Sequence, residues 1–147
     1  MKLLSTSASN TKIAKTQKKE QIQTRVASLS LYPDHITCAG SKAAKCMEAC
    51  LKSAGMGVFS NVKAGRKAKT DWFHADQDAF LAQLCKELYN FDKLCKRSGS
   101  IGQVRLNTIS DIAWEKLGVP QLFPDLSFYD YTKRVHRIGN TPTNYKL

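Results

Sequence analysis

The clearest pattern in the chain is a helical repeat of apolar residues between residues 77 and 97. The apolar side chains recur every three or four positions, which is the period of an amphipathic α-helix. Asp76 can cap its start, and Ser98-Gly99 can end it. The repeat predicts a helix from Gln77 to Arg97 whose buried stripe is Phe80, Leu81, Leu84, Cys85, Leu88, Phe91, Leu94 and Cys95. Cys85 and Cys95 are therefore interpreted as packing residues.

A second pattern, alternation of apolar and polar residues, predicts short β-strands. It occurs in three segments that precede turn-forming residues, and both ends of the chain add a shorter apolar segment. The expected strands are Met1–Thr6, Arg25–Tyr32, Gln103–Asn107, Leu126–Tyr131 and a last one that begins at Asn144.

Weaker signals predict three further helices. One is expected over Ala43–Ala54, closed by Gly55 and Gly57, and one from Ser60 or Asn61 to about Phe73. A short third helix is expected over Ile112–Leu117.

The order of these elements predicts an α/β fold. Helices between strands favour parallel pairing, so we expect a partial barrel or an open, mostly parallel sheet with flanking helices. Residues 1–24 are expected to be a basic, partly mobile segment, and residues 25–147 a single α/β domain. Because the last strand begins so near the end, this domain is expected to be the N-terminal part of a larger unit.

Composition adds a strong positive charge. The chain of 147 residues carries a formal net charge of +11, which suits nucleic acid or a phosphate-bearing substrate as partner, with simple solubility as the alternative explanation. No apolar run is long enough to cross a membrane, and no signal peptide is recognisable. The expected compartment is therefore a reducing cytoplasm, and the odd number of cysteines, five, agrees with it. The oligomeric state is left open.

Three of the five cysteines lie close together after the first long strand. Cys46 and Cys50 are four residues apart, so on a helix they would share one face, and Cys38 precedes them. Three thiolates can hold an iron–sulfur cluster with one open iron. Zinc is the alternative and would need a fourth ligand such as His35 or His74. Three reduced structural thiols are the remaining interpretation.

Polar residues follow the later strands and should meet the cysteines, because parallel strands bring functional groups together beyond their carboxyl ends. The expected catalytic residues are Asn107, Asp111, Asp130 and Lys133. Ser110 and Thr132 are the expected cofactor-binding residues.

Other charged residues have alternative interpretations. Asp111 and Glu115 can equally cap the short helix, and Arg105 is expected to pair with Asp130. His136 and Arg137 belong to a basic segment interpreted as surface. A helix would place Lys63, Arg66 and Lys67 on one face, which suits phosphate or nucleic acid but also simple solvation.

An ordered set of motifs resembles an uncharacterised bacteriophage-encoded family, a domain of unknown function. The motifs are Cys38 with Cys46–Gly55, Phe59–Val62, Lys69–Phe73, Val104–Glu115 and Phe128–Lys133. Members of that family usually continue past the Asn144-Tyr145 motif. The resemblance implies a phage protein in the host cytoplasm.

The cysteine segment is also similar in placement to the cluster loop of radical S-adenosylmethionine enzymes, although its gaps of seven and three residues differ from theirs. This similarity implies an iron–sulfur radical or redox enzyme that uses S-adenosylmethionine. The alternative is a non-enzymatic nucleic-acid-binding phage protein with structural cysteines or zinc.

Overall fold

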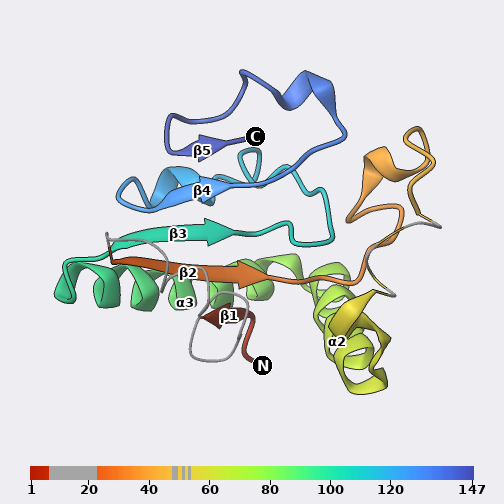
Figure 1. Cartoon of the computed structure of the whole chain (residues 1–147), viewed down its shortest axis with the longest axis horizontal. Coiled ribbons are helices and arrows are strands. Elements are labelled where there is room, and N and C mark those ends of the chain that lie inside the picture. Colours follow the sequence, from red (N-terminus) through yellow and green to blue (C-terminus); the bar gives the residue numbers. More distant parts are fainter. Residues whose placement is uncertain (7–22, 48–49, 51, 53) are drawn as a thin grey trace.

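The computed structural model describes residues 1–6, 23–47, 50, 52 and 54–147. They form an open five-stranded sheet in the order β1-β2-β3-β4-β5 (Figure 1). The strands are β1 (Leu4–Thr6), β2 (Thr24–Leu29), β3 (Ile101–Arg105), β4 (Ser127–Tyr129) and β5 (Tyr145–Lys146). β1 pairs antiparallel with β2, and the remaining neighbours are parallel. The predicted α/β class and the open, mostly parallel sheet are confirmed.

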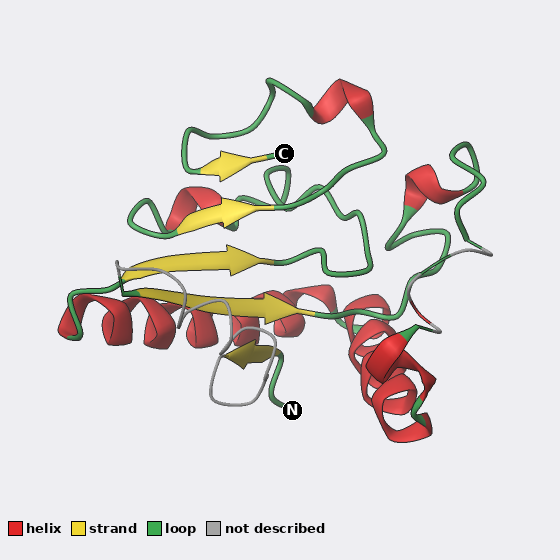
Figure 2. Ribbon diagram, viewed as in Figure 1, coloured by secondary structure: helices red, strands yellow, loops and turns green. Residues whose placement is uncertain are grey.

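In the described part of the chain, two α-helices lie between β2 and β3 in sequence. They are α2 (Ser60–Ala75) and α3 (Gln77–Arg97), and α3 runs along the sheet and contacts β3 (Figure 2). The Asp76 side chain accepts a hydrogen bond from the Ala79 amide and caps α3, as predicted. α2 continues to Ala75, slightly beyond the expected end near Phe73.

The apolar stripe of α3 builds the core beneath the sheet. Phe80, Leu84, Leu88, Phe91 and Cys95 are buried, whereas Leu94 at the edge of the stripe is more exposed. α3 lies close to β3 at Gly102, where an added Cβ atom would lie 2.5 Å from Leu126 Cδ2 and 3.1 Å from Cys95 Sγ. The interpretation of Cys95 as a packing residue is confirmed, and Cys85 packs against the same core while half-buried.

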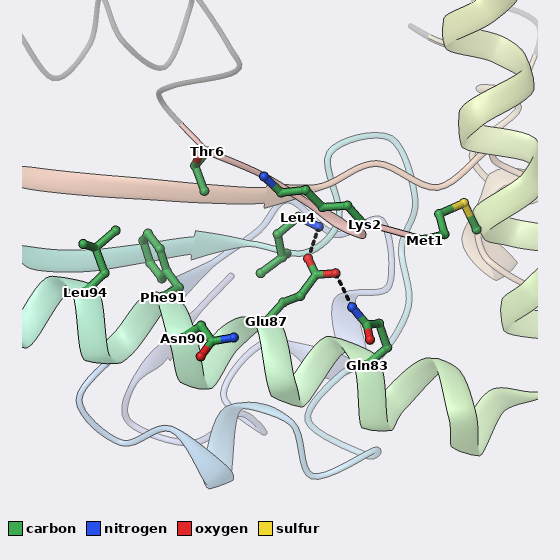
Figure 3. Close-up of a pocket in the computed structure, with 9 residues that line it drawn as sticks. All are labelled: Met1, Lys2, Leu4, Thr6, Gln83, Glu87, Asn90, Phe91 and Leu94. Carbon is green, nitrogen blue, oxygen red and sulfur yellow. Dashed lines mark hydrogen bonds between the residues drawn. The ribbon is translucent and has the colours of Figure 1, made fainter.

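The segment that leads into β1 is held by side chains of both helices, and Figure 3 shows the bond between Leu4 and Glu87 of α3. The Glu87 carboxylate on α3 accepts hydrogen bonds from the Leu3 and Leu4 amides, and Lys69 on α2 donates to the Leu3 carbonyl. A groove of about 440 Å³ lies between β1 and α3. The predicted basic segment continues from β1, and its residues 7–22 lie outside the described residues.

Two expected helices are wrong. Residues 42–45 form turns, and Cys46 and Cys50 lie in non-helical backbone, while residues 48, 49, 51 and 53 lie outside the described part. Lys45 has a φ angle of +48°, in the left-handed region, which interrupts a right-handed helix. Regular segments here include the 3₁₀ helices η2 (Ala39–Ser41) and η4 (Gly55–Val58).

The helix expected over Ile112–Leu117 is replaced by turns that lead to the 3₁₀ helix η5 (Pro120–Leu122). The backbone at the start of the expected helix is bonded to a side chain instead. The Asn107 side chain accepts a hydrogen bond from the Ile112 amide and donates one to the Ile112 carbonyl. A further 3₁₀ helix, η6 (Val135–Arg137), lies between β4 and β5.

Candidate functional site

A pocket of about 360 Å³ lies beyond the carboxyl ends of the parallel strands. Three segments meet there: the cysteine segment after β2, the loop after β3 and the loop after β4, toward which the arrowheads point in Figure 1. The lining residues are Cys38, Cys46, Cys50, Arg105, Asn107, Thr108, Ile109, Ser110, Tyr131 and Lys133. Of the predicted site residues, the structure thus brings together the three cysteines, Asn107, Ser110 and Lys133. Asp111, Asp130 and Thr132 lie behind this lining.

The cysteine segment begins with a turn fixed by Asp34. The Asp34 carboxylate accepts hydrogen bonds from the Ile36 and Thr37 amides and contacts His74 Nε2 at 2.7 Å. Burial alone would raise the pKa of Asp34, but the hydrogen bonds from Thr37 and His74 outweigh burial and lower it. The Thr37 carbonyl then accepts from the Asp111 amide at 2.7 Å, which joins this turn to the loop after β3.

The three pocket thiols differ in their surroundings. Cys38 is buried, and Cys46 and Cys50 are half-buried; none of them is in a disulfide. Burial raises the pKa of the Cys38 thiol, and the charge of Asp111 raises it further. Cys46 Sγ lies 3.9 Å from the Ser41 carbonyl oxygen.

The thiols do not form a ligand set for a metal as they stand. Within the described part of the chain, no three His, Cys, Asp or Glu side chains are grouped so that they could hold a metal ion. His74, one of the two expected fourth ligands, is paired with Asp34, and His35 is exposed. The cysteines therefore share a pocket without sharing a metal-binding geometry.

Arg105 reaches the pocket from the end of β3. Its Nε atom lies 4.0 Å from Asp130 Oδ1, so the expected pair is a charge contact that is too long for a hydrogen bond. Among the described residues this buried Nε has no hydrogen-bond partner. The guanidinium stacks on Tyr131, with 4.8 Å between its central carbon and the ring centroid.

Asn107 organises the loop after β3. Its Oδ1 atom accepts hydrogen bonds from Ser110 Oγ, the Ile112 amide and Trp114 Nε1. Its Nδ2 group donates to the Ile112 carbonyl and to Asp130 Oδ2. With donors and acceptor both engaged, the side chain fixes the pocket wall.

Asp130 is buried behind this wall. It accepts hydrogen bonds from the Asn107 amide at 2.8 Å and from the Tyr145 hydroxyl at 2.7 Å. Burial raises the pKa of Asp130 to about 6, against the lowering effect of these hydrogen bonds and of Arg105. Burial likewise raises the pKa of Tyr145, and the Asp130 carboxylate adds to that shift.

Arg137 was missed by the sequence analysis, which assigned it to a basic surface. Its side chain is 1% exposed and makes a bidentate pair with Glu115 at 2.9 and 2.8 Å. Its Nη1 atom donates to Asp111 at 2.6 Å. Burial acts to lower the pKa of Arg137, but Glu115 and Tyr145 outweigh it and the pKa is raised. The sequence around Arg137 is basic and does not indicate that its guanidinium is buried, because the acidic partners are distant in sequence.

The Asp111 carboxylate also holds the loop after β4. It accepts hydrogen bonds from Thr132 Oγ1 and from the Lys133 amide. Asp111 and Thr132 thus position Lys133 at the pocket by bonds within the protein. The assignment of catalytic and cofactor-binding roles to these residues stays a prediction.

The expected phosphate-binding face on α2 is divided in the structure. Lys67 is exposed, whereas Lys63 and Arg66 are half-buried. Arg66 Nη1 is buried and has no hydrogen-bond partner among the described residues. It would lie 3.1 Å from a Cβ atom at Gly57, so Arg66 approaches η4 while Lys67 faces solvent.

A protein-family model described as Gene product 88 matches residues 2–147. The chain belongs to this family. It is an uncharacterised, phage-type family, which agrees with the resemblance seen in the motifs. Searches of the curated proteins and of the solved structures found no significant match. No described helix has the length and apolar character needed to span a membrane.

Proposed function

We propose that this member of the Gene product 88 family binds a phosphate-bearing ligand in the pocket beyond β3 and β4. The observation that carries the proposal is the charge of the lining: Arg105 and Lys133 are cationic, and none of the described lining residues is Asp or Glu. The buried Nε of Arg105, which lacks a hydrogen-bond partner among the described residues, would gain one from a phosphate oxygen. The position also agrees with the rule that open α/β sheets bind ligands beyond the carboxyl ends of their strands.

Calorimetric titration with inorganic pyrophosphate tests this function. We expect saturable binding that Arg105→Gln weakens by about 10-fold or more, because a charge-assisted hydrogen bond is lost. Arg97→Gln is the matched control, since it removes the same charge from an exposed position at the end of α3. Absence of binding to the unaltered protein, or equal weakening by both variants, would refute a phosphate site at Arg105.

A metal centre held by Cys38, Cys46 and Cys50 is the second candidate. Its support is that all three thiols line one pocket. An iron–sulfur cluster is the first expectation and zinc the alternative; either would require the cysteine segment to rearrange, because these thiols are not grouped as metal ligands. Binding of S-adenosylmethionine and a radical or redox activity both require that cluster, so neither is proposed if the cluster is absent.

Anaerobic purification followed by iron, sulfide and zinc analysis tests the metal centre. Stoichiometric metal that Cys46→Ala removes and Cys85→Ala retains would support it, since Cys85 belongs to α3. Metal-free protein would leave the three cysteines as pocket-lining thiols. The pyrophosphate experiment does not depend on this outcome.

A further inference from the structure

Tyr131 is an exposed aromatic residue at the mouth of the phosphate pocket. It directly follows the buried Asp130 and is 70% exposed. It lines the pocket together with Lys133, and the Arg105 guanidinium stacks on its ring. Single exposed aromatic residues are common on protein surfaces. Tyr131 differs because a cation holds its ring at the mouth of a pocket, which indicates a binding role.

The backbone on both sides of Tyr131 is anchored. On one side, the Asp130 amide donates to the Lys146 carbonyl and its carboxylate is held by Tyr145. On the other side, Thr132 Oγ1 donates to the Asp111 carboxylate at 2.9 Å. Tyr131 therefore presents its ring from a fixed position, which lowers the entropic cost of binding against it.

Further cations lie beside this loop. A Cβ atom added to Gly40 would meet Arg134 Cγ at 3.2 Å and Lys133 Cβ at 3.4 Å, so the turn around Gly40 packs on these two residues. Lys42 and Lys45 follow in the same segment and are exposed. Positive charge thus extends from the pocket onto the neighbouring surface, in a chain whose net charge is +11.

From this arrangement we infer that the pocket binds a nucleotide of a single-stranded nucleic acid. The inference rests on the proposed phosphate site and adds the substrate class. The base stacks on Tyr131, a phosphate contacts Arg105 and Lys133, and neighbouring phosphates follow the exposed lysines. Aromatic platforms beside cationic grooves are how proteins bind single strands, whose bases offer an open face that a duplex conceals.

Fluorescence anisotropy with two labelled strands of equal length tests the inference. One is oligothymidylate, and the other is an abasic strand that has the same phosphates and no bases. We expect oligothymidylate to bind more tightly, and Tyr131→Ala to weaken its binding by about 10-fold, because one base–aromatic stack is lost. Tyr131→Ala should change the affinity for the abasic strand by no more than about 2-fold, because the phosphate contacts of that strand are unchanged.

Two variants control for folding and for exposed aromatics in general. Tyr131→Phe keeps the ring and should bind oligothymidylate like the unaltered protein. Tyr89→Ala removes a tyrosine that is 60% exposed on α3, outside the pocket, and should have no effect.

The outcomes separate the inference from the proposed function. Equal affinity for both strands, no effect of Tyr131→Ala, or equally tight binding of duplex DNA would overturn the single-strand inference while pyrophosphate binding persists. Tight binding of free thymidine monophosphate with no gain for the strand would also overturn it and favour a mononucleotide ligand. If neither strand nor pyrophosphate binds, the phosphate site itself is wrong.

Discussion

The face of the sheet covered by α3 and the carboxyl edge of the sheet are both buried, but different forces hold them. Under α3 the contacts are apolar, between residues such as Leu84, Leu88 and Phe91 and the strands. At the carboxyl edge, buried charges and amides bond to one another, with Arg137 between Asp111 and Glu115. The apolar region gains free energy from every buried carbon atom, whereas the polar region depends on each partner being present.

The same contrast separates the cysteines. Cys95 fills space between α3 and β3, while Cys38, Cys46 and Cys50 line a pocket beside Arg105. A region held by directional bonds can leave a polar group such as Arg105 Nε without a hydrogen-bond partner among the described residues, so that it is available to a ligand. We therefore expect stability to be spread over both regions and ligand binding to be confined to the carboxyl edge.

The largest expected effect is on the buried cation of the polar region. Arg137→Met should lower the free energy of unfolding by about 4 kcal/mol, because it leaves Asp111 and Glu115 buried without their partner. Urea unfolding followed by circular dichroism measures the loss. Arg97→Met, at an exposed position, should cost less than about 0.5 kcal/mol. A loss of less than about 1 kcal/mol for Arg137→Met would contradict the contrast between the two regions.

A pH-dependent effect should follow from Asp130. Below its ordinary pKa of 3.8 the carboxyl is neutral in both the folded and unfolded states, so its ionisation costs nothing. Between pH 3.8 and about 6 the unfolded state releases the Asp130 proton, whereas the folded state keeps it because burial disfavours the carboxylate, so rising pH favours the unfolded state. Above about 6 the carboxyl is ionised in both states and the loss is complete. The protein should therefore lose roughly 3 kcal/mol relative to Asp130→Asn over this range.

Urea unfolding of both proteins across this pH range measures the difference. Comparison with Asp130→Asn cancels the contributions of the other carboxylates. A difference that stays constant with pH would show that Asp130 has an ordinary pKa in the folded protein.

The apolar region should respond to added volume. Gly102→Ala should destabilise the protein by about 2 kcal/mol, since the new methyl group would meet Leu126 and Cys95. Gly65→Ala is the control: its Cβ would meet no atom within 4 Å, and it lies inside α2. It should stabilise by about 0.5–1 kcal/mol, because alanine favours a helix over glycine. Thermal unfolding should show a lower unfolding temperature for Gly102→Ala and a higher one for Gly65→Ala. Similar changes in the two variants would argue against tight packing at Gly102.

The smallest expected effect concerns thiol reactivity. Half-buried Cys46 and Cys50 should react with iodoacetamide about 10-fold faster than Cys95, which is 2% exposed and whose pKa is raised by burial. Mass spectrometry of digested protein after timed alkylation gives the rates. Equal rates at all three positions would indicate that the two regions open together.

The elements that could be predicted are those set by local pattern. The stripe of α3, its Asp76 cap and the strands needed only the period of the apolar residues and nearby capping groups. The two wrong helices had no such strong period. Lys45 has a left-handed backbone in one, and in the other the Asn107 side chain bonds the backbone of Ile112.

The site was predicted in outline because parallel strands bring their following loops together whatever those loops contain. The cysteines, Asn107, Ser110 and Lys133 meet in one pocket for that reason. Arg105 and Tyr131 were not assigned to the pocket, since their stacking joins β3 to the loop after β4, and neither segment's sequence pattern indicates that contact.

The sequence by itself determined the α/β class, the long helix, and the segments that meet at the carboxyl edge, because these depend on local periodicity and strand order. Only the tertiary structure decided which charged groups are buried and which face the pocket. Arg137 is bound to Glu115, 22 residues away, and to Asp111, 26 residues away. A charge is stable in the interior only where distant partners are folded against it, and that arrangement exists only in three dimensions.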